Sequence, residues 1–220
     1  MRPIRKPCAK RHSPAATARS TCKTEGPPVP CACGTGGPVA LIQIETDIAG
    51  RADRIAQLFR TTFTASEGAE EGALIGDLAQ DLLATTPPQD IRVFLGIEAG
   101  ALIAAAIFTR LAYPEDRRQV FLLSPMAVVP DRQGKGVGQT LLRGALEALT
   151  RDGIDAALTY GDPAYYARVG FAPITAQEAA PPLSLSMPEG WLGQSLTGEA
   201  VFPLQGPSRS APALDHAAFW

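Results

Sequence analysis

The spacing of apolar residues predicts a chain in which strands and helices alternate. Apolar positions on one helical face predict a helix over residues 55–63 and a second over 74–83, which Pro87 and Pro88 end. The polar residues 64–72 between them are predicted to form a loop. Short runs rich in branched and apolar residues predict the strands, which cover residues 39–45, 91–98, 101–110, 120–129, 156–160, 183–187 and 200–204.

A third amphipathic helix follows the strand at 120–129. Its apolar positions run from Val137 to Leu149 on one face, and Gly153 ends it. A short helix is predicted at residues 163–169, and the tripeptide Glu98-Ala99-Gly100 predicts a hairpin. These elements predict the α/β class in its mixed α+β form, with a central mixed sheet and helices on both faces.

Pro125 is unusual because it lies inside an apolar strand. Proline has no N–H to give to a sheet, so the sequence predicts a bulge or a splayed edge at this point. Backbone groups beside such a break are free to bind a ligand. The strand then leads into a loop with three alternating glycines, Gly134, Gly136 and Gly138.

The glycine loop predicts a binding site for a phosphate-bearing cofactor. Glycine adopts positive φ readily, so successive N–H groups can converge on an anion at the start of the following helix. A nucleotide P-loop is excluded, because Lys135 lies between glycines and no Ser or Thr follows it directly. A dinucleotide fingerprint fits poorly, because Gly138 comes one residue too early.

The remaining pattern is Gln/Arg-x-x-Gly-x-Gly/Ala, present here as Gln133-Gly134-Lys135-Gly136-Val137-Gly138. Together with Ser124-Pro125-Met126-Ala127-Val128, it resembles the acetyl-coenzyme A site of the GNAT superfamily of N-acetyltransferases. A second segment, Tyr166-Ala167-Arg168-Val169-Gly170-Phe171, resembles that family's Tyr-x-Lys/Arg-x-Gly-Phe sequence. Residues 161–166 resemble a bacterial subgroup known only as predicted N-acetyltransferases, whose substrates the sequence does not imply.

The resemblance implies the GNAT acyl-CoA N-acyltransferase fold and an acetyl-CoA-dependent enzyme without a metal. It implies that the strands ending at Val129 and Tyr160 splay apart to admit the pantetheine arm, and that a backbone N–H near Val128 stabilises the oxyanion. An amine is expected to attack the thioester directly, with Tyr166 as the acid that protonates the departing thiolate. The expected cofactor-binding residues are Met126, Ala127, Val128, Gln133, Gly134, Lys135, Gly136, Val137 and Gly138.

Several residues keep a second interpretation. Tyr166 is the candidate catalytic residue, but it also fits a packing role against Phe171, and Tyr165 is assigned to packing. Thr159 stands where the family often has asparagine, and Asp162 fits a helix cap as well as a general base. The rival function is an acyl-CoA binding or sensing module that transfers nothing.

Composition and charge bound the partners. The chain has 220 residues, 45% of them hydrophobic, and a net charge of −2. Residues 1–38 carry seven basic residues and one acid, a net +6, which leaves −8 for the rest. An acidic body argues against nucleic acid and suits a cationic small-molecule or peptide amine. No apolar run approaches the ~20 residues of a membrane span, so a cytoplasmic protein without membrane contact is expected. Both a monomer and a homodimer are compatible with the sequence.

The positions of the cysteines help to divide the chain into a tail and a folded part. All four, at positions 8, 22, 31 and 33, lie in residues 1–38, a basic and proline-containing tail predicted to be disordered. Their spacing disfavours a zinc site. The tail also resembles an organellar transit peptide, and a start assigned too far upstream explains it equally well. We therefore expect a tail at 1–38, an N-acetyltransferase domain at 39–187, and an extension packed on it at 188–220.

Overall fold

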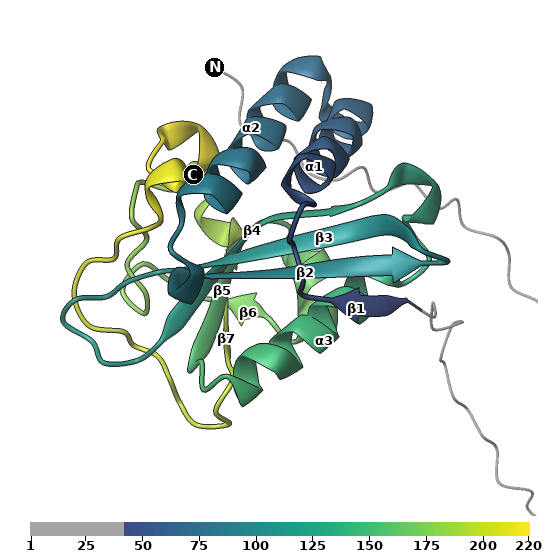
Figure 1. The fold of residues 1–220 in the computed structure, drawn as a ribbon. Coiled ribbons are helices and arrows are strands. Elements are labelled where there is room, and N and C mark those ends of the chain that lie inside the picture. Colours follow the sequence, from purple (N-terminus) through teal and green to yellow (C-terminus); the bar gives the residue numbers. More distant parts are fainter. Residues whose placement is uncertain (1–41) are drawn as a thin grey trace, which may run out of the picture.

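The apolar runs of the chain pair into one seven-stranded sheet, whose order is β1-β2-β3-β4-β5-β7-β6 (Figure 1). The computed structural model describes residues 42–220, so the expectations for the tail at 1–38 lie outside the described residues. All neighbouring strands are antiparallel except β4 and β5, which are parallel. The strands are β1 (Gln43–Glu45), β2 (Ile91–Glu98), β3 (Ala101–Arg110), β4 (Val120–Val128), β5 (Ala156–Tyr160), β6 (Ala172–Pro173) and β7 (Trp191–Ser195).

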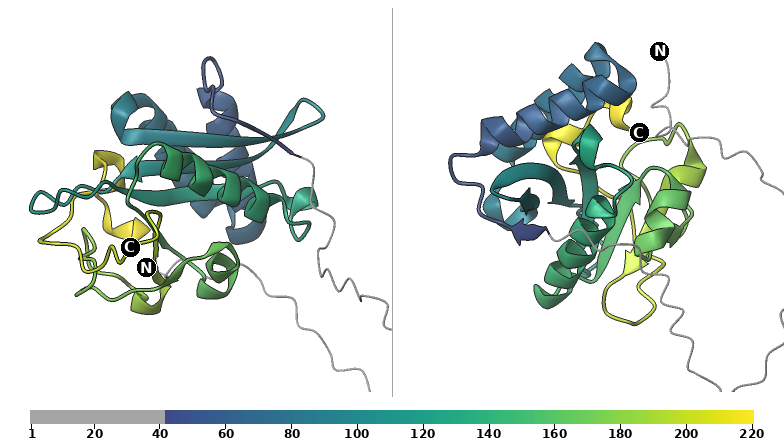
Figure 2. Two further views of the ribbon diagram at one scale, coloured as in Figure 1. Left: turned by 90° about the horizontal axis from the view of Figure 1, so that it is seen from below. Right: turned by 90° about the vertical axis from the view of Figure 1, so that its right-hand side faces the viewer.

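Helices cover both faces of the sheet, as the sequence predicted. Helices α1 (Ala52–Glu67) and α2 (Ala69–Thr85) lie on one face, and α3 (Val137–Arg151) lies on the other (Figures 1 and 2). The short α4 (Pro163–Tyr166) lies on the same face of the sheet as α3, and its two tyrosines pack against the apolar cluster that contains the buried residues of α3. Six short 3-10 turns complete the described chain: Pro88–Asp90, Pro130–Arg132, Ala167–Val169, Pro188–Gly190, Pro212–Leu214 and Ala217–Phe219.

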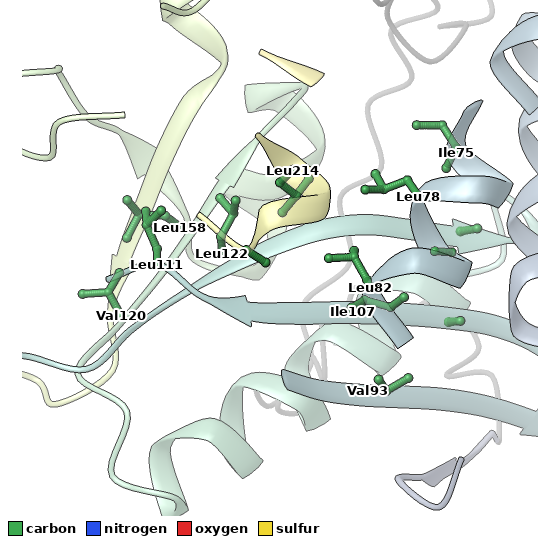
Figure 3. Close-up of a cluster of buried hydrophobic side chains, with 14 of the residues drawn as sticks. Ile75, Leu78, Leu82, Val93, Ile107, Leu111, Val120, Leu122, Leu158 and Leu214 are labelled. Carbon is green, nitrogen blue, oxygen red and sulfur yellow. The ribbon is translucent and has the colours of Figure 1, made fainter. Parts of the chain in front are cut away.

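Strand alternation divides the core into two clusters, one on each face of the sheet. Leu122 of β4 faces α2 and the C-terminal segment, whereas its neighbours Phe121 and Leu123 face α3. Figure 3 shows the first cluster, in which Leu82 of α2 and Leu214 of the C-terminal segment reach the sheet. Because side chains pack on both faces of β4, its position is fixed from both sides.

The predicted loop over residues 64–72 is wrong. Helix α1 continues to Glu67, and Gly68 alone, with φ at 105°, separates it from α2. The polar residues of this stretch are the outward faces of two helices, so apolar spacing alone did not identify them. The helices also cross closely at Gly72, where an added Cβ would lie 1.9 Å from the Thr64 hydroxyl.

The predicted strands at 183–187 and 200–204 are also wrong. The apolar residues of both segments pack against the sheet, but the segments are loops. The strand that the sequence analysis missed in this region is β7. Trp191, at the start of β7, is fully buried, and its indole N–H donates to the Ala179 carbonyl at 2.9 Å. Because β7 pairs with both β5 and β6, the segment expected as an extension at 188–220 supplies a strand of the central sheet.

An ion pair fastens the C-terminal segment to the sheet. Arg118, just before β4, pairs with Asp116 and donates to the carbonyls of Val201 and Pro203. The Asp116 carboxylate, whose side chain is only 5% exposed, also accepts from the Gln205 N–H at 2.8 Å. The bond from Arg118 is the main cause that holds the pKa of Asp116 well below its usual range.

We predict that Asp116→Asn lowers the free energy of unfolding by about 2 kcal/mol at neutral pH, because a charge-assisted hydrogen bond in a buried site is lost. The pKa of Asp116 is lower in the folded protein than in the unfolded chain. Its contribution to the free energy of unfolding is therefore present above about pH 4 and is lost as the pH falls further. Urea unfolding from pH 7 to pH 3 tests this. The gap between wild type and variant should narrow with acid, and a pH-independent gap would contradict it. Asp152→Asn, at a half-exposed pair with Arg92, is the control and should change little.

Candidate functional site

The site begins where β4 and β5 stop pairing. Their last paired residues are Leu123 and Thr159, and beyond them each strand keeps a partner only on its outer side. Ser124 and Pro125 together oppose the single residue Ile107 of β3, which is a β-bulge. The bulge predicted from Pro125 is therefore confirmed. It leaves the last three residues of β4 with one edge that β5 does not cover.

Hydrogen bonding to β3 shows which backbone groups face this open edge. The Val129 N–H donates to the Ile103 carbonyl at 2.9 Å, so by strand alternation Ala127 also points to β3. The amides of Met126 and Val128 then point toward the open side. The Gln133 side chain donates to the Val128 carbonyl at 2.8 Å, which joins the glycine loop to the strand edge.

The glycine loop delivers free amides to the start of α3. Gly134 and Gly136 have φ of 72° and 82°, and an added Cβ at either would meet no heavy atom within 4 Å. The first helical bond runs from Thr140 N–H to the Gly136 carbonyl, so the amides of residues 137–139 have no acceptor within the helix. The first turn of α3 carries no acidic residue, and Lys135 is exposed in the loop. This arrangement is suited to binding an anion.

The two tyrosines of α4 lie on the same side of the sheet as Met126 and Val128. Tyr166 makes edge-to-face contacts with Tyr165 at 5.1 Å and with Phe171 at 5.7 Å between ring centroids. Gly161 makes room for it, because a Cβ there would lie 2.8 Å from Cε2 of the Tyr166 ring. The packing against Phe171 is therefore real, and it holds the phenol near Thr159, where β4 and β5 stop pairing.

Burial raises the pKa of Tyr166 above its ordinary value, so the phenol keeps its proton at neutral pH. The Thr159 hydroxyl beside the phenol acts in the opposite direction and lowers the pKa of Tyr166. Thr159 is fully buried and donates to the Leu123 carbonyl at 3.2 Å, across the last pair of β4 and β5. This threonine thus connects the point where the strands separate to the candidate acid.

Of the two roles open to Asp162, the structure shows helix capping. Its carboxylate accepts from the Ala164 N–H at 2.9 Å at the start of α4.

Arg132 is held by ion pairs with Glu98 and Asp131. The arrangement offers free backbone donors, a protonated phenol and an uncovered strand edge, which together suit an extended ligand with a phosphate at one end.

Comparison with known proteins agrees with this geometry. Residues 89–173 match the model of the acetyltransferase (GNAT) domain. The uncharacterized N-acetyltransferase YjhQ of Escherichia coli K12 is 30% identical over 130 residues, which cover 57% of this chain and 72% of YjhQ. The chain belongs to the GNAT acetyltransferase family. The uncharacterized N-acetyltransferase YhbS of the same strain is 31% identical to this GNAT protein over 135 residues, 60% of this chain and 72% of YhbS.

Solved structures show the same fold. The crystal structure of E. coli YhbS in complex with CoA aligns with a TM-score of 0.68 at 21% identity, over 81% of this GNAT chain and 94% of that one. A GNAT acetyltransferase from Brucella melitensis in complex with acetyl-CoA aligns with a TM-score of 0.59 at 21% identity, over 81% and 97% of the two chains. The expected fold is therefore confirmed, and the protein is an N-acetyltransferase of this family.

Other features of the site region were not expected from sequence. The Tyr165 hydroxyl lies near Gly138 at the start of α3, and Thr159 lies between the last β4–β5 pair and Tyr166. Nothing in the spacing of residues indicated either contact. Over residues 42–220 no helix is long and apolar enough to span a bilayer. In the same part of the chain, no three His, Cys, Asp or Glu side chains gather as a metal site would require.

We predict that Gly161→Ala destabilises the protein by about 1–3 kcal/mol, because its Cβ forces the Tyr166 ring to move. Urea unfolding measures the loss, and near-ultraviolet circular dichroism reports the displaced ring. The matched test repeats Gly161→Ala in a Tyr166→Leu background, where the Cε2 contact no longer exists. The substitution should then cost less; an equal cost in both backgrounds would show that Tyr166 is not what fills the space.

Proposed function

We propose that this protein transfers the acetyl group of acetyl-CoA to a primary amine by direct attack on the thioester. The observation that carries the proposal is the continuity of free backbone donors, from the open edge at Met126 and Val128 to the start of α3. A pantetheine arm added beside β4 would meet the edge, and a pyrophosphate at Gln133–Gly138 would meet the loop amides. That related proteins were crystallised with CoA and acetyl-CoA supports this choice of cofactor.

The chemistry needs no covalent enzyme intermediate. A cationic acceptor first loses one proton to water, and the neutral nitrogen then bonds to the thioester carbon. A backbone N–H near Val128 stabilises the oxyanion. The carbon–sulfur bond then breaks, and the thiolate takes the proton of Tyr166. The nitrogen loses a proton to water, and the tyrosinate recovers a proton from the solvent. Burial raises the pKa of Tyr166, so the phenol carries its proton at neutral pH when the thiolate departs.

The acceptor is proposed to be a cationic small-molecule or peptide amine. Residues 39–220 carry the net negative charge of the chain, which attracts a cation and repels nucleic acid. A cytoplasmic location, without membrane contact, fits such substrates. The second candidate is an acyl-CoA binding module that transfers nothing, and an open strand edge alone fits it equally well. What favours the enzyme is a protonated phenol near Thr159, the residue at which β4 and β5 stop pairing.

We predict that coenzyme A binds saturably and that Gly136→Ala weakens binding at least tenfold, because the added methyl group enters the space for the pyrophosphate. Gly153→Ala is the matched control. It lies at the other end of α3, has a similar positive φ of 76°, and also has nothing within 4 Å of an added Cβ. Both variants should lose similar stability from backbone strain. Isothermal titration calorimetry should show the binding loss in Gly136→Ala alone; equal affinities in both variants would contradict the proposed pyrophosphate site.

We predict that Tyr166→Phe lowers kcat at least a hundredfold and leaves the affinity for coenzyme A unchanged, because only the proton donor is removed. The assay measures release of free thiol with a panel of amines. In the wild type, the rate should not fall at alkaline pH until above about pH 10, since the pKa of Tyr166 is raised.

Thr159, whose hydroxyl lies beside the Tyr166 phenol, offers a second test of the role of Tyr166. Thr159→Val removes the hydroxyl at constant shape and should lower kcat, whereas Thr159→Ser should restore most of it. Thiol release that is equal in the wild type and Tyr166→Phe would remove Tyr166 from the mechanism. Tight coenzyme A binding without transfer to any amine would favour the binding-module alternative.

A further inference from the structure

Tyr165 reaches across the site toward two separate elements. Its hydroxyl lies 3.9 Å from the Met126 sulfur on β4. An added Cβ at Gly138, in the first turn of α3, would lie only 2.2 Å from the same hydroxyl. The phenol therefore sits between the strand edge and the start of the helix, which are the two parts of the proposed acyl-CoA site.

The Tyr165 hydroxyl has a hydrogen-bond donor that the protein hardly uses. Within residues 42–220, the hydroxyl donates to the Met126 sulfur, and a thioether is a weak acceptor at this distance. Burial raises the pKa of Tyr165, so the donor persists at physiological pH. A partly buried hydroxyl with so weak a partner keeps its donor available for a better acceptor.

We propose that Tyr165 binds the acyl-CoA by donating its hydroxyl where the cofactor passes between the edge of β4 and the start of α3. This inference rests on the proposed function. Phosphate oxygens and amide carbonyls of the cofactor are strong acceptors, so the ligand offers what Met126 does not. The edge-to-face contact with Tyr166 fixes the ring, and thus couples cofactor position to the candidate acid.

A role in packing alone would not require the hydroxyl group of Tyr165. Phenylalanine would fill the same space and keep the contact with Tyr166, so packing does not explain a hydroxyl directed at the helix start. Gly138 also fits the proposal, because any larger residue there would compete with the hydroxyl for space.

Calorimetric titration with coenzyme A tests the proposal with Tyr165→Phe, which removes only the hydroxyl. We expect binding about tenfold weaker than in the wild type, the effect of one hydrogen bond to a polar or charged acceptor. Tyr113→Phe is the matched control: its hydroxyl donates to the Ala180 carbonyl at 2.9 Å, in the other core cluster, and its affinity should stay at the wild-type value. Thermal unfolding verifies that each variant is folded.

The outcomes separate this inference from the proposed function. If the wild type does not bind coenzyme A, the proposed function fails and the inference fails with it. If the wild type binds and Tyr165→Phe binds equally or more tightly, only the inference is overturned. Gly138→Ala gives a second test, because its methyl group displaces the hydroxyl. It should weaken binding in the wild type and have a smaller effect in Tyr165→Phe; effects of equal size in both backgrounds would overturn the inference.

Discussion

The loss of pairing between β4 and β5 after Leu123 and Thr159 is the constraint on which the rest of the site depends. The Ser124–Pro125 bulge changes the course of β4 at this point, and proline has no N–H to continue a ladder. Strand β5 meanwhile stays paired to β7 up to Tyr160. The sheet thus remains continuous at its base and opens at one end.

The opening would be unfavourable without compensation, because it leaves backbone groups of a central strand unpaired. Some are satisfied internally: Gln133 donates to the Val128 carbonyl, and Thr159 to that of Leu123. The remaining amides face a space bordered by the helix start and by two tyrosines. Side chains pack on both faces of the sheet around this arrangement and fix the course of β4 and β5.

The sequence predicted those features whose cause is local. Glycines at 134 and 136 require positive φ, Pro125 interrupts a strand, and the hairpin turn at Ala99-Gly100 closes β2 on β3. The predictions from sequence were wrong where contacts between residues far apart in the chain determine the structure. The polar stretch at 64–72 is helical because α1 and α2 pack on each other, and β7 is a strand because β5 offers it an edge. The contacts of Thr159 and Tyr165 likewise depend on how the sheet brings separate elements together.

The central claim is that the open edge of β4 accepts the cofactor as an added strand, and amide hydrogen exchange tests it most directly. Exchange at residues 126–128 would be followed by NMR in the free protein and at saturating coenzyme A. Because Ala127 already faces β3, its amide should be protected in both states. The amides of Met126 and Val128 should exchange quickly in the free protein and become protected on binding. If coenzyme A saturates the protein and the exchange of both amides stays unchanged, the cofactor does not pair with this edge.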